Sequence, residues 1–503
     1  MKRILSLIVC FAVLFSTSLG LFSTSLAEQG NANRILQVSL EGSPDSLDPH
    51  VFSGSLSMWS TSMMHDFLIK FDDQLNIVPG LAKSWEYISD TEIKFILRDD
   101  AFFHNGRKVV AEDIKNTYER VLDEQVGSRY RAHILAIESI ETNGESEVIL
   151  KLSYPYSPLL ARLTQVAIIP IEELDKIANE PVGCGPFKFS EYEFDQYIEM
   201  VKFEEHYDAE NVKISGIRFT FLPEYNAART AFLAGDLDIL LWADPADIPN
   251  LRNQENATVV ETELLALYYI GFDLTRAPFD DARIRKAIYL ALDRQQYVDQ
   301  VLQKNGKPMY ALVDPLSPYY DEKWTTQQRI DEAKKLLADA GFPDGFTTTV
   351  VTPNTPVEGP VGEILQSQLA AIGINVKLEK PDVATYLDQV FTRNDFEVMI
   401  CGTTGFGDPD DPSYTFLHPD GSNYKNFKYQ NQEVWDLLEK GRSNYTEEDR
   451  KQYYSEAFQI VYDEAPIIPI MNETRYSVIH NDIKGFVARQ NLTYDFSHIT
   501  FTD

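Results

Sequence analysis

The pattern of hydrophobic and polar positions is clearest in the second half of the chain, where it has helical periodicity. Apolar residues recur at three- and four-residue intervals over 284–292, 330–340 and 361–372. This spacing places them on one face of a helix, so it predicts three amphipathic helices. Gly341 and Gly373 directly follow the second and third segments, and a glycine at that position is typical of a helix end.

Strands are predicted where hydrophobic and polar residues alternate, over 34–40, 93–97, 374–378 and 396–400. A further helix is predicted over Val383–Phe391, between the last two of these strands. Strand, helix and strand in this order form a β-α-β unit, which implies neighbouring parallel strands and a right-handed crossover. The succession of elements therefore predicts an α/β fold.

The first 27 residues have the organisation of an export signal. Lys2 and Arg3 precede an apolar run over 4–14, and small residues end the segment. The run is well short of the roughly 18–20 apolar residues that a membrane span needs. Cys10 lies inside it, too early for a lipid-attachment cysteine. We predict that 1–27 is a cleaved signal peptide and that the protein is secreted in soluble form.

The charge of the chain limits its partners. The 503 residues include 77 acidic and 45 basic side chains, which give a formal net charge of −32. Such a surface repels phosphate backbones and anionic membranes, so nucleic acid is not an expected partner. The hydrophobic content of 44% and the length are those of a globular protein with several domains.

Catalytic and metal-binding motifs are absent from the sequence. G-x-S-x-G, H-E-x-x-H, G-x-x-x-x-G-K-[ST] and C-x-x-C do not occur, and the eight histidines form no i, i+4 pair. The acidic run 408–412 lacks the spacing of a calcium loop; a solvated turn is predicted there, with calcium as the alternative. Cys184 and Cys401 remain after signal cleavage, and two buried thiols are favoured over one bridge. We expect no enzyme and no cofactor.

Two local patterns have structural interpretations. Gly183 and Gly185 precede Pro186, and this spacing predicts a tight connection that accepts only residues without a Cβ atom. Arg285 and Arg294 lie mostly off the apolar face of their helical segment, so they are predicted to be surface or domain-interface charges.

Several short segments of the chain resemble one family when they are taken together in order. They are the residues 46–49 (SLDP), 81–86 (LAKSWE), 95–98 (FILR), 103–106 (FHNG), 111–114 (AEDI), 183–187 (GCGPF), 278–294 (PFDDARIRKAIYLALDR), 336–346 (LLADAGFPDGF) and 368–374 (QLAAIGI). In this order and spacing they resemble the extracytoplasmic solute-binding proteins of ABC importers, a family that includes dipeptide-, oligopeptide- and nickel-binding proteins.

The resemblance implies an α/β, periplasmic-binding-protein-like fold of two lobes joined by two hinge strands, with an extra small domain. Lobe I would comprise 28–62, 181–275 and 476–503, the small domain 63–180, and lobe II 276–475. Closure of the lobes around a small solute would present a surface to the permease in the inner membrane. The expected protein is a periplasmic monomer that makes and breaks no bonds.

The resemblance also implies where the solute lies. In relatives that bind peptides, the ligand pairs through its main chain with the edge that follows a lobe II strand, a form of β-augmentation. The corresponding ligand-binding candidates here are Phe52, Ser53 and Gly54 in lobe I, Tyr268 and Tyr269 near the crossover, and Cys401, Gly402, Thr403, Thr404, Gly405, Phe406 and Asp408 after the predicted strand.

Two positions depart from the pattern of dipeptide binders. Gly405 stands where those proteins have an aspartate for the peptide ammonium, and Gly359 stands where they have an arginine for the carboxylate. Asp408 is the predicted substitute for the first. The leading hypothesis is an oligopeptide receptor. The alternatives are a receptor for another solute, an oligosaccharide or a chelated metal, and a secreted hydrolase.

Overall fold

The computed structural model describes residues 34–315, 317–404 and 407–502. The predicted signal peptide therefore lies outside the described residues, as do the candidate site residues Gly405 and Phe406.

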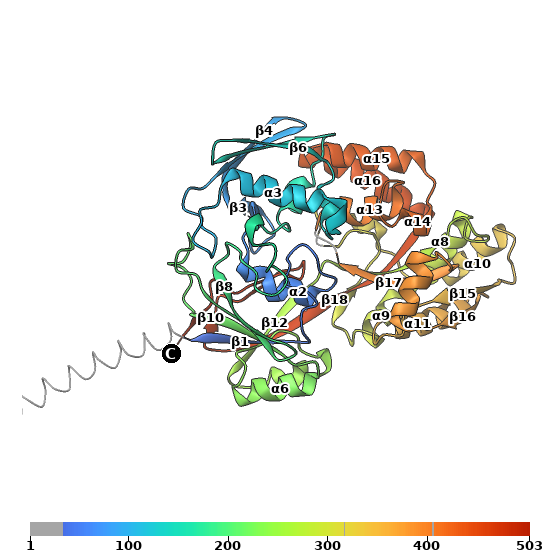
Figure 1. Cartoon of the computed structure of the whole chain (residues 1–503). Coiled ribbons are helices and arrows are strands. Elements are labelled where there is room, and N and C mark those ends of the chain that lie inside the picture. The colour runs from blue at the N-terminus through green and yellow to red at the C-terminus, as the bar shows by residue number, and fades with distance from the viewer. Residues whose placement is uncertain (1–33, 316, 405–406, 503) are drawn as a thin grey trace, which may run out of the picture.

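One mixed sheet runs through both lobes (Figure 1). Among the described residues it has 12 strands, ten of them in the order β16-β15-β17-β13-β18-β11-β1-β10-β9-β8, while β12 and β14 also pair with β18. The strands of this sheet are β1 (Ile35–Leu40), β8 (Phe187–Glu193), β9 (Tyr197–Lys202), β10 (Gly216–Phe221), β11 (Ile239–Leu240), β12 (Ala257–Glu263), β13 (Ala266–Phe272), β14 (Gly306–Pro308), β15 (Thr347–Val351), β16 (Asn375–Glu379), β17 (Val398–Thr404) and β18 (Ile467–His480).

Two long antiparallel segments carry the sheet from one lobe to the other. β12 pairs with β18 from Thr474 to His480, and β13 pairs with β18 from Ile467 to Met471. The 14-residue β18 therefore belongs to both halves of the sheet. β12 and β13, which follow each other in the chain, pair with its second and first parts. These are the two hinge strands that the resemblance implies, so the two-lobed fold is confirmed. The residue limits given above for the domains stay a prediction.

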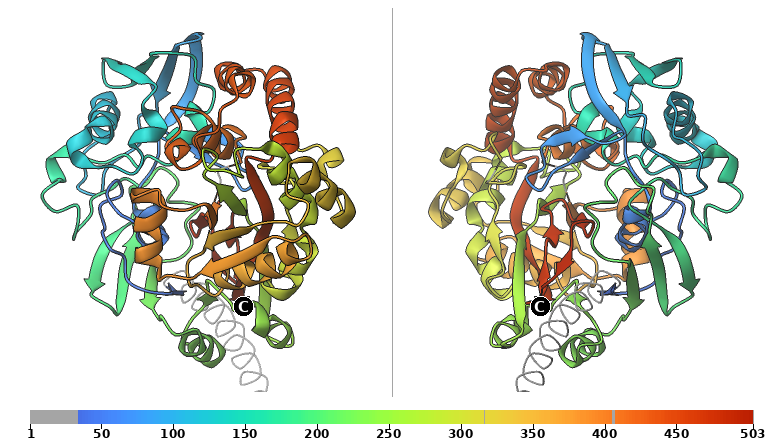
Figure 2. Two further views of the ribbon diagram at one scale, coloured as in Figure 1. Left: turned by 90° about the vertical axis from the view of Figure 1, so that its right-hand side faces the viewer. Right: turned by 90° about the vertical axis from the view of Figure 1, so that its left-hand side faces the viewer.

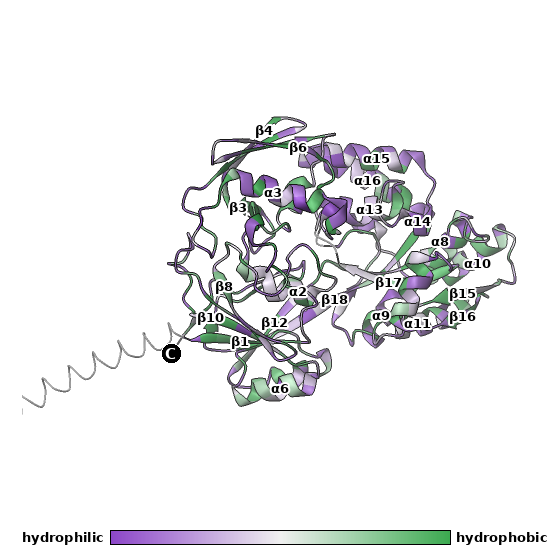
Figure 3. Ribbon diagram, in the orientation of Figure 1, coloured by the Kyte–Doolittle hydropathy of each residue, from purple (hydrophilic) through white to green (hydrophobic). Residues whose placement is uncertain are grey.

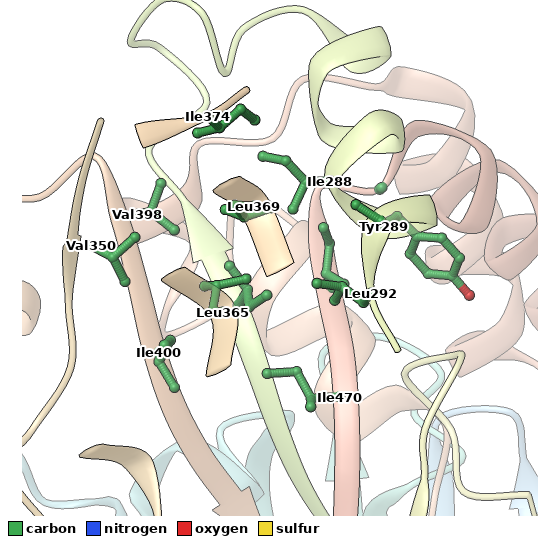
Figure 4. Packing of buried hydrophobic residues seen from close by; sticks show 14 of the residues in the cluster. Ile288, Tyr289, Leu292, Val350, Leu365, Leu369, Ile374, Val398, Ile400 and Ile470 are labelled. Carbon is green, nitrogen blue, oxygen red and sulfur yellow. The ribbon is translucent and has the colours of Figure 1, made fainter. Parts of the chain in front are cut away.

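The helices of lobe II cover its strands and supply most of its core. They are α8 (Ala282–Ala291), α9 (Arg294–Gln300), α10 (Ile330–Asp339), α11 (Glu358–Ala370) and α12 (Val383–Leu387), the last continued by a π-helical turn over Asp388–Thr392. The predicted apolar faces are confirmed: Ile288 and Leu292 of the α8 region pack with Leu365 and Leu369 of α11 against Val398 of β17 (Figure 4). Because each helix buries one stripe against the sheet, removal of apolar surface from water stabilises this arrangement.

The order of the parallel strands in lobe II differs from the predicted one. β16 and β17 are both parallel to β15, which lies between them. The predicted pairing of neighbours across α12 is therefore wrong, because the short Thr347–Val351 strand inserts between the two. β17 also begins and ends later than the predicted strand over 396–400, since its pairing with β13 continues to Thr404.

The small domain has its own sheet and core. Its four antiparallel strands have the order β4-β5-β7-β6, and α3 packs on them. Ile93, Phe95 and Leu97 are buried, as their alternation predicts. The elements are β4 (Ala82–Ser89), β5 (Glu92–Leu97), β6 (Ile137–Asn143), β7 (Glu147–Leu152), α3 (Ala111–Leu122), α4 (Arg131–Ile134) and α5 (Leu159–Leu163).

The helices of lobe II after β17 reach the small domain, as Figures 1 and 2 show for α15 and α16. They are α13 (Asp410–Leu417), α14 (Tyr424–Phe427), α15 (Gln432–Ser443) and α16 (Glu447–Glu464). The Ser157 amide donates to the Arg442 carbonyl at 2.8 Å, and the ring centroids of Tyr87 and Tyr445 are 4.6 Å apart. Hydrophobic residues concentrate on strands such as β1 and β10, whereas α15 is largely hydrophilic (Figure 3).

The remaining elements are short and lie mainly in lobe I. They are α2 (Ser55–Thr61), α6 (Tyr225–Ala234), α7 (Ile248–Leu251), β2 (Ile69–Phe71), β3 (Ile77–Pro79), β19 (Ile483–Lys484), β20 (Val487–Ala488), β21 (Tyr494–Asp495) and β22 (Thr500–Phe501). Over the described part of the chain, every helix is too short or too polar to traverse a lipid bilayer.

The prediction that Arg285 and Arg294 are surface or domain-interface charges is wrong, because both side chains are buried within lobe II. Arg294 Nε donates to the Pro469 carbonyl at 2.9 Å, and Arg285 Nη1 donates to the Phe279 carbonyl at 2.7 Å. The periodicity of apolar residues identifies only one buried face of a helix. Here α10 and α16 pack on α8, and β18 packs on α9, so positions outside that face are buried as well. Both guanidinium groups satisfy backbone carbonyls, which would otherwise be buried without donors.

The prediction for Gly183 and Gly185 is confirmed. A Cβ atom on Gly183 would lie 1.9 Å from the Met64 carbonyl oxygen, and one on Gly185 would lie 2.6 Å from the His65 nitrogen. The chain here touches the backbone of the segment after α2, so neither position has space for a side chain.

We predict that Gly183→Ala lowers the free energy of unfolding by about 2–3 kcal/mol, because backbone would have to move. The matched control is Gly359→Ala in α11, where the nearest atom to an added Cβ is 3.9 Å away and alanine favours the helix. Denaturant unfolding of both variants measures the difference; equal effects would contradict the steric explanation.

Candidate functional site

A cavity of about 870 Å³ lies between the small domain and lobe II, at the start of the hinge strand β13. Its volume is that of a site for a medium-sized organic solute. The side chains that line it include Leu135, Tyr154, Tyr156 and Arg162 from the small domain, Leu265, Ala266 and Leu267 from the hinge, and Met309, Thr403, Asp408, Asp410, Asp411, Tyr414, Phe416, Glu439 and Arg442 from lobe II.

The end of β17 forms one border of this cavity and has one open edge. β17 pairs with β13 along its whole length, but it pairs with β15 only at Val398 and Met399. From Ile400 to Thr404 the second edge therefore has no strand partner among the described residues. Cys401–Thr404, predicted to follow the strand, are instead its last four residues.

The backbone groups at this edge alternate in direction. The Tyr386 hydroxyl donates to the Ile400 carbonyl at 2.7 Å from the side opposite to β13. Because alternate residues of a strand turn their N–H and C=O groups to the same edge, those of Gly402 and Thr404 face the open edge as well. An extended chain laid along β17 can pair with them.

The side chains on the two faces of β17 have different surroundings. Thr403 lines the cavity, and Tyr269, on the same face of neighbouring β13, is buried, with its ring centroid 5.2 Å from that of Phe416. On the opposite face, Tyr268 is half-buried and its hydroxyl donates to Glu473 at 3.2 Å. Gly402 lies beside that ring, because a Cβ there would come within 2.8 Å of Tyr268 Cε1.

The lobe I candidates lie apart from the cavity. The ring centroids of Phe52 and Tyr130 are 6.1 Å apart, and the Arg129 guanidinium is 4.6 Å from the Phe52 ring. The Ser53 amide donates to Asp45 at 2.7 Å, and Gly54 precedes α2. Of the twelve predicted site residues, Thr403 and Asp408 are lining residues of the cavity; a role for the others in binding stays a prediction.

The small domain contributes one wall of the cavity, which was not predicted from the sequence. Tyr154, Tyr156 and Arg162 line the cavity opposite Tyr414 and Arg442, about 260 residues away along the chain. Only the contact between the small domain and lobe II brings these residues together, so no local pattern could have identified them.

The acidic run 408–412 is not a solvated turn, which corrects that prediction. The Asp408 carboxylate accepts hydrogen bonds from Arg450 at 2.8 and 2.9 Å. Asp411 pairs with Arg162 at 2.8 Å, and buried Asp410 lies 3.3 Å from Arg442. Each of these three carboxylates thus has an arginine partner. The arginines come from three different helices, α5, α15 and α16, and they meet the acidic run at the start of α13.

One of these pairs spans the cavity. Arg162 belongs to α5 of the small domain and Asp411 to α13 of lobe II. The Arg442 guanidinium lies 3.3 Å from the centroid of the Tyr414 ring and 4.8 Å from that of Tyr156. The two sides of the cavity are thus joined by an ion pair and by cation–π contacts, which are strongest where water is excluded.

Burial controls the protonation of Asp410. Desolvation raises the pKa of its carboxyl to about 6, although Arg442 lowers it. The Tyr454 hydroxyl also contacts this carboxylate at 3.2 Å. A carboxyl with this pKa changes charge in the mildly acidic range.

The described residues contain neither a disulfide nor a group of metal ligands. Both cysteines are free thiols, Cys184 buried and Cys401 half-buried, and burial raises the pKa of the Cys401 thiol to about 11. Within the described ranges, no three His, Cys, Asp or Glu side chains are grouped to hold a metal ion.

The fold and the site define a class of protein: a two-lobed receptor that encloses a solute beside its hinge. The chain belongs to the bacterial extracellular solute-binding proteins of family 5, because the model of the family's middle region matches residues 76–424. Members of this family are transport receptors and not enzymes, so the hydrolase hypothesis is set aside.

Three similar proteins illustrate the relationship. The dipeptide-binding protein of Escherichia coli is 23% identical, over 96% of this chain and 97% of its own. The oligopeptide-binding protein AppA of Bacillus subtilis is 26% identical, over 96% and 95%. The Helicobacter pylori periplasmic binding protein DppA, solved with the peptide STSA, superposes with a TM-score of 0.80 at 22% identity, over 95% of this chain and 99% of its own, which supports the fold.

The pKa of Asp410 leads to a testable pH dependence. Because its pKa is higher in the folded protein than the ordinary 3.8, the folded state binds the proton more tightly, and this contribution to stability is lost as pH rises from about 4 to 6. We therefore expect wild type to lose up to about 3 kcal/mol relative to Asp410→Asn between pH 4 and pH 7.

Denaturant unfolding at several pH values measures this difference. Asp420→Asn is the matched control, because Asp420 also lines the cavity but its side chain is largely exposed. Parallel stability curves for wild type and Asp410→Asn over this range would contradict the assignment.

Proposed function

We propose that this protein is the substrate receptor of an ABC importer and that its solute is an oligopeptide bound along the open edge of β17. The observation that carries the proposal is the juxtaposition of that edge with the cavity. A peptide is the solute class that offers a regular row of N–H and C=O groups to a strand edge, together with side chains for a neighbouring cavity.

The length of the edge favours more than a dipeptide. The stretch without a strand partner, Ile400–Thr404, covers five residues, and a strand rises about 3.3 Å per residue. The Ile400 carbonyl is occupied by the Tyr386 hydroxyl, which leaves Cys401–Thr404 for a ligand. At the two positions where dipeptide binders have their charged groups, Gly405 lies outside the described residues and no charged side chain is available at the other. Gly359 offers no side chain, and the Asp408 carboxylate is already engaged by Arg450. Main-chain pairing with several residues supplies affinity without such clamps.

The relatives support the same solute class. The two curated relatives described above are named for binding dipeptides and oligopeptides. We infer that this chain is exported to the periplasm by its first 27 residues and acts there as a monomer. Hinge bending at 264–265, between β12 and β13, would close the lobes over the peptide and present them to a permease in the inner membrane.

Ligand-dependent thermal and chemical stability tests the solute class. We expect peptides of three to six residues at 100 times their Kd to add about 2.7 kcal/mol to the free energy of unfolding. Oligosaccharides of similar size are the comparison. Stabilisation by the sugars and not by the peptides would overturn the proposal.

Backbone methylation tests the mode of binding. Alternate N–H groups of a strand face the same edge, so N-methylation of one set of amides in a bound tetrapeptide should weaken binding about tenfold or more. Methylation of the other set should have a much smaller effect. Calorimetry on the two methylated isomers measures this, and equal losses would argue against pairing with β17.

A further inference from the structure

A carboxylate with one oxygen that has no partner among the described residues lies near the open edge of β17, on the face opposite the cavity. Glu358 is the first residue of α11 and is half-buried. Its Oε2 accepts a hydrogen bond from the Thr355 hydroxyl, while no hydrogen bond or ion pair reaches Oε1 among the described residues. The lysine near this helix terminus, Lys380, pairs instead with Glu363 at 2.6 Å.

The free oxygen lies over the middle of the unpaired stretch of β17. A Cβ on Gly402 would lie 3.5 Å from Glu358 Oε1, so this oxygen is close to the strand on its Tyr268 face. Gly402 is also one of the residues whose backbone groups face outward. A Cβ there would also come within 2.8 Å of Tyr268 Cε1, so the carboxylate, the strand and the Tyr268 ring lie close together.

A peptide paired with β17 would place alternate side chains on the two faces of the strand. Those on the Thr403 face enter the cavity, whereas those on the Tyr268 face meet Glu358. On that second face the Tyr268 hydroxyl is already bound to Glu473, and the nearby Arg475 lies 3.7 Å from the same carboxylate. The surroundings therefore leave Glu358 without a cation of the protein.

We propose that Glu358 determines specificity by binding a cationic group of the solute, so that the receptor prefers peptides with an ammonium or guanidinium group on the Tyr268 face. This rests on the proposed function, because it requires a peptide along β17. A half-buried carboxylate gains most from a charge-assisted hydrogen bond, and such a bond discriminates against neutral solutes whose burial would leave the charge unpaired.

The experiment uses a set of tetra-alanine peptides in which lysine or its neutral isostere norleucine replaces each alanine in turn. Each peptide is prepared with a free and an acetylated amino terminus, and binding to the full mature protein is measured by calorimetry. We expect at least one lysine peptide to bind wild type about tenfold more tightly than its norleucine counterpart, a difference of 1.4 kcal/mol. Glu358→Gln should abolish that preference, because glutamine still accepts the Thr355 hydrogen bond but carries no charge.

Glu363→Gln is the matched control. It removes one negative charge from the same helix, but its carboxylate is 59% exposed and pairs with Lys380, so the lysine preference should survive. Thermal melting of both variants verifies that α11 is intact.

The outcomes separate this inference from the proposed function. Loss of a preference for free over acetylated peptides in Glu358→Gln would support it and identify the cation as the amino terminus. Peptide binding without a cation preference, or with one that persists in Glu358→Gln, would overturn it and leave the proposed function intact. Failure of all peptides to bind would overturn both.

Discussion

The antiparallel pairing of β18 with β12 and β13 is the constraint on which the rest of the structure depends. A single 14-residue strand is shared by the sheets of both lobes, so the lobes are held together by main-chain hydrogen bonds rather than by a flexible linker. In the proposed closure, bending at the short break between β12 and β13 would change the angle between the lobes while the strand pairs on each side stay intact. The same pairing places β17 next to the hinge, since β13 is its only partner at residues 400–404 among those described.

The elements that depend on local periodicity could be predicted from the sequence. The apolar stripe of the α8 region and the tight connection at Gly183 and Gly185 can each be recognised within a short segment of the sequence, and the structure confirms both. The place of β15 between β16 and β17 could not be predicted, because the order of parallel strands depends on which edge is free when each crossover packs. Arg285 and Arg294 were misjudged for a related reason: a helix packed on several sides buries positions outside its apolar stripe, and the buried guanidinium groups then donate to backbone carbonyls.

Only the part of the candidate site that lies at the end of β17 could be predicted from the sequence. Thr403 and its neighbours follow from the resemblance, since a strand end is a continuous segment. The small-domain wall with Tyr154 and Arg162 depends on an interface between distant parts of the chain, and so does the pairing of the acidic run with three arginines. Charge patterns in a sequence show which groups are available, but their partners are decided by tertiary contacts.

The distribution of charge around β17 connects the hinge with selectivity. On the cavity face, Asp408, Asp410 and Asp411 are all matched by arginines, and one of those arginines belongs to the other side of the cavity. The Asp411–Arg162 pair therefore joins the small domain to lobe II, while the pairs of Asp408 and Asp410 lie within lobe II. On the opposite face, Glu358 has no such partner among the described residues. Three carboxylates are thus neutralised by arginines of the protein, one of them across the domains, whereas the carboxylate proposed to select the solute lies near an open strand edge. This is why a neutralising substitution at 358 should alter the choice of solute, whereas one at 410 should alter stability.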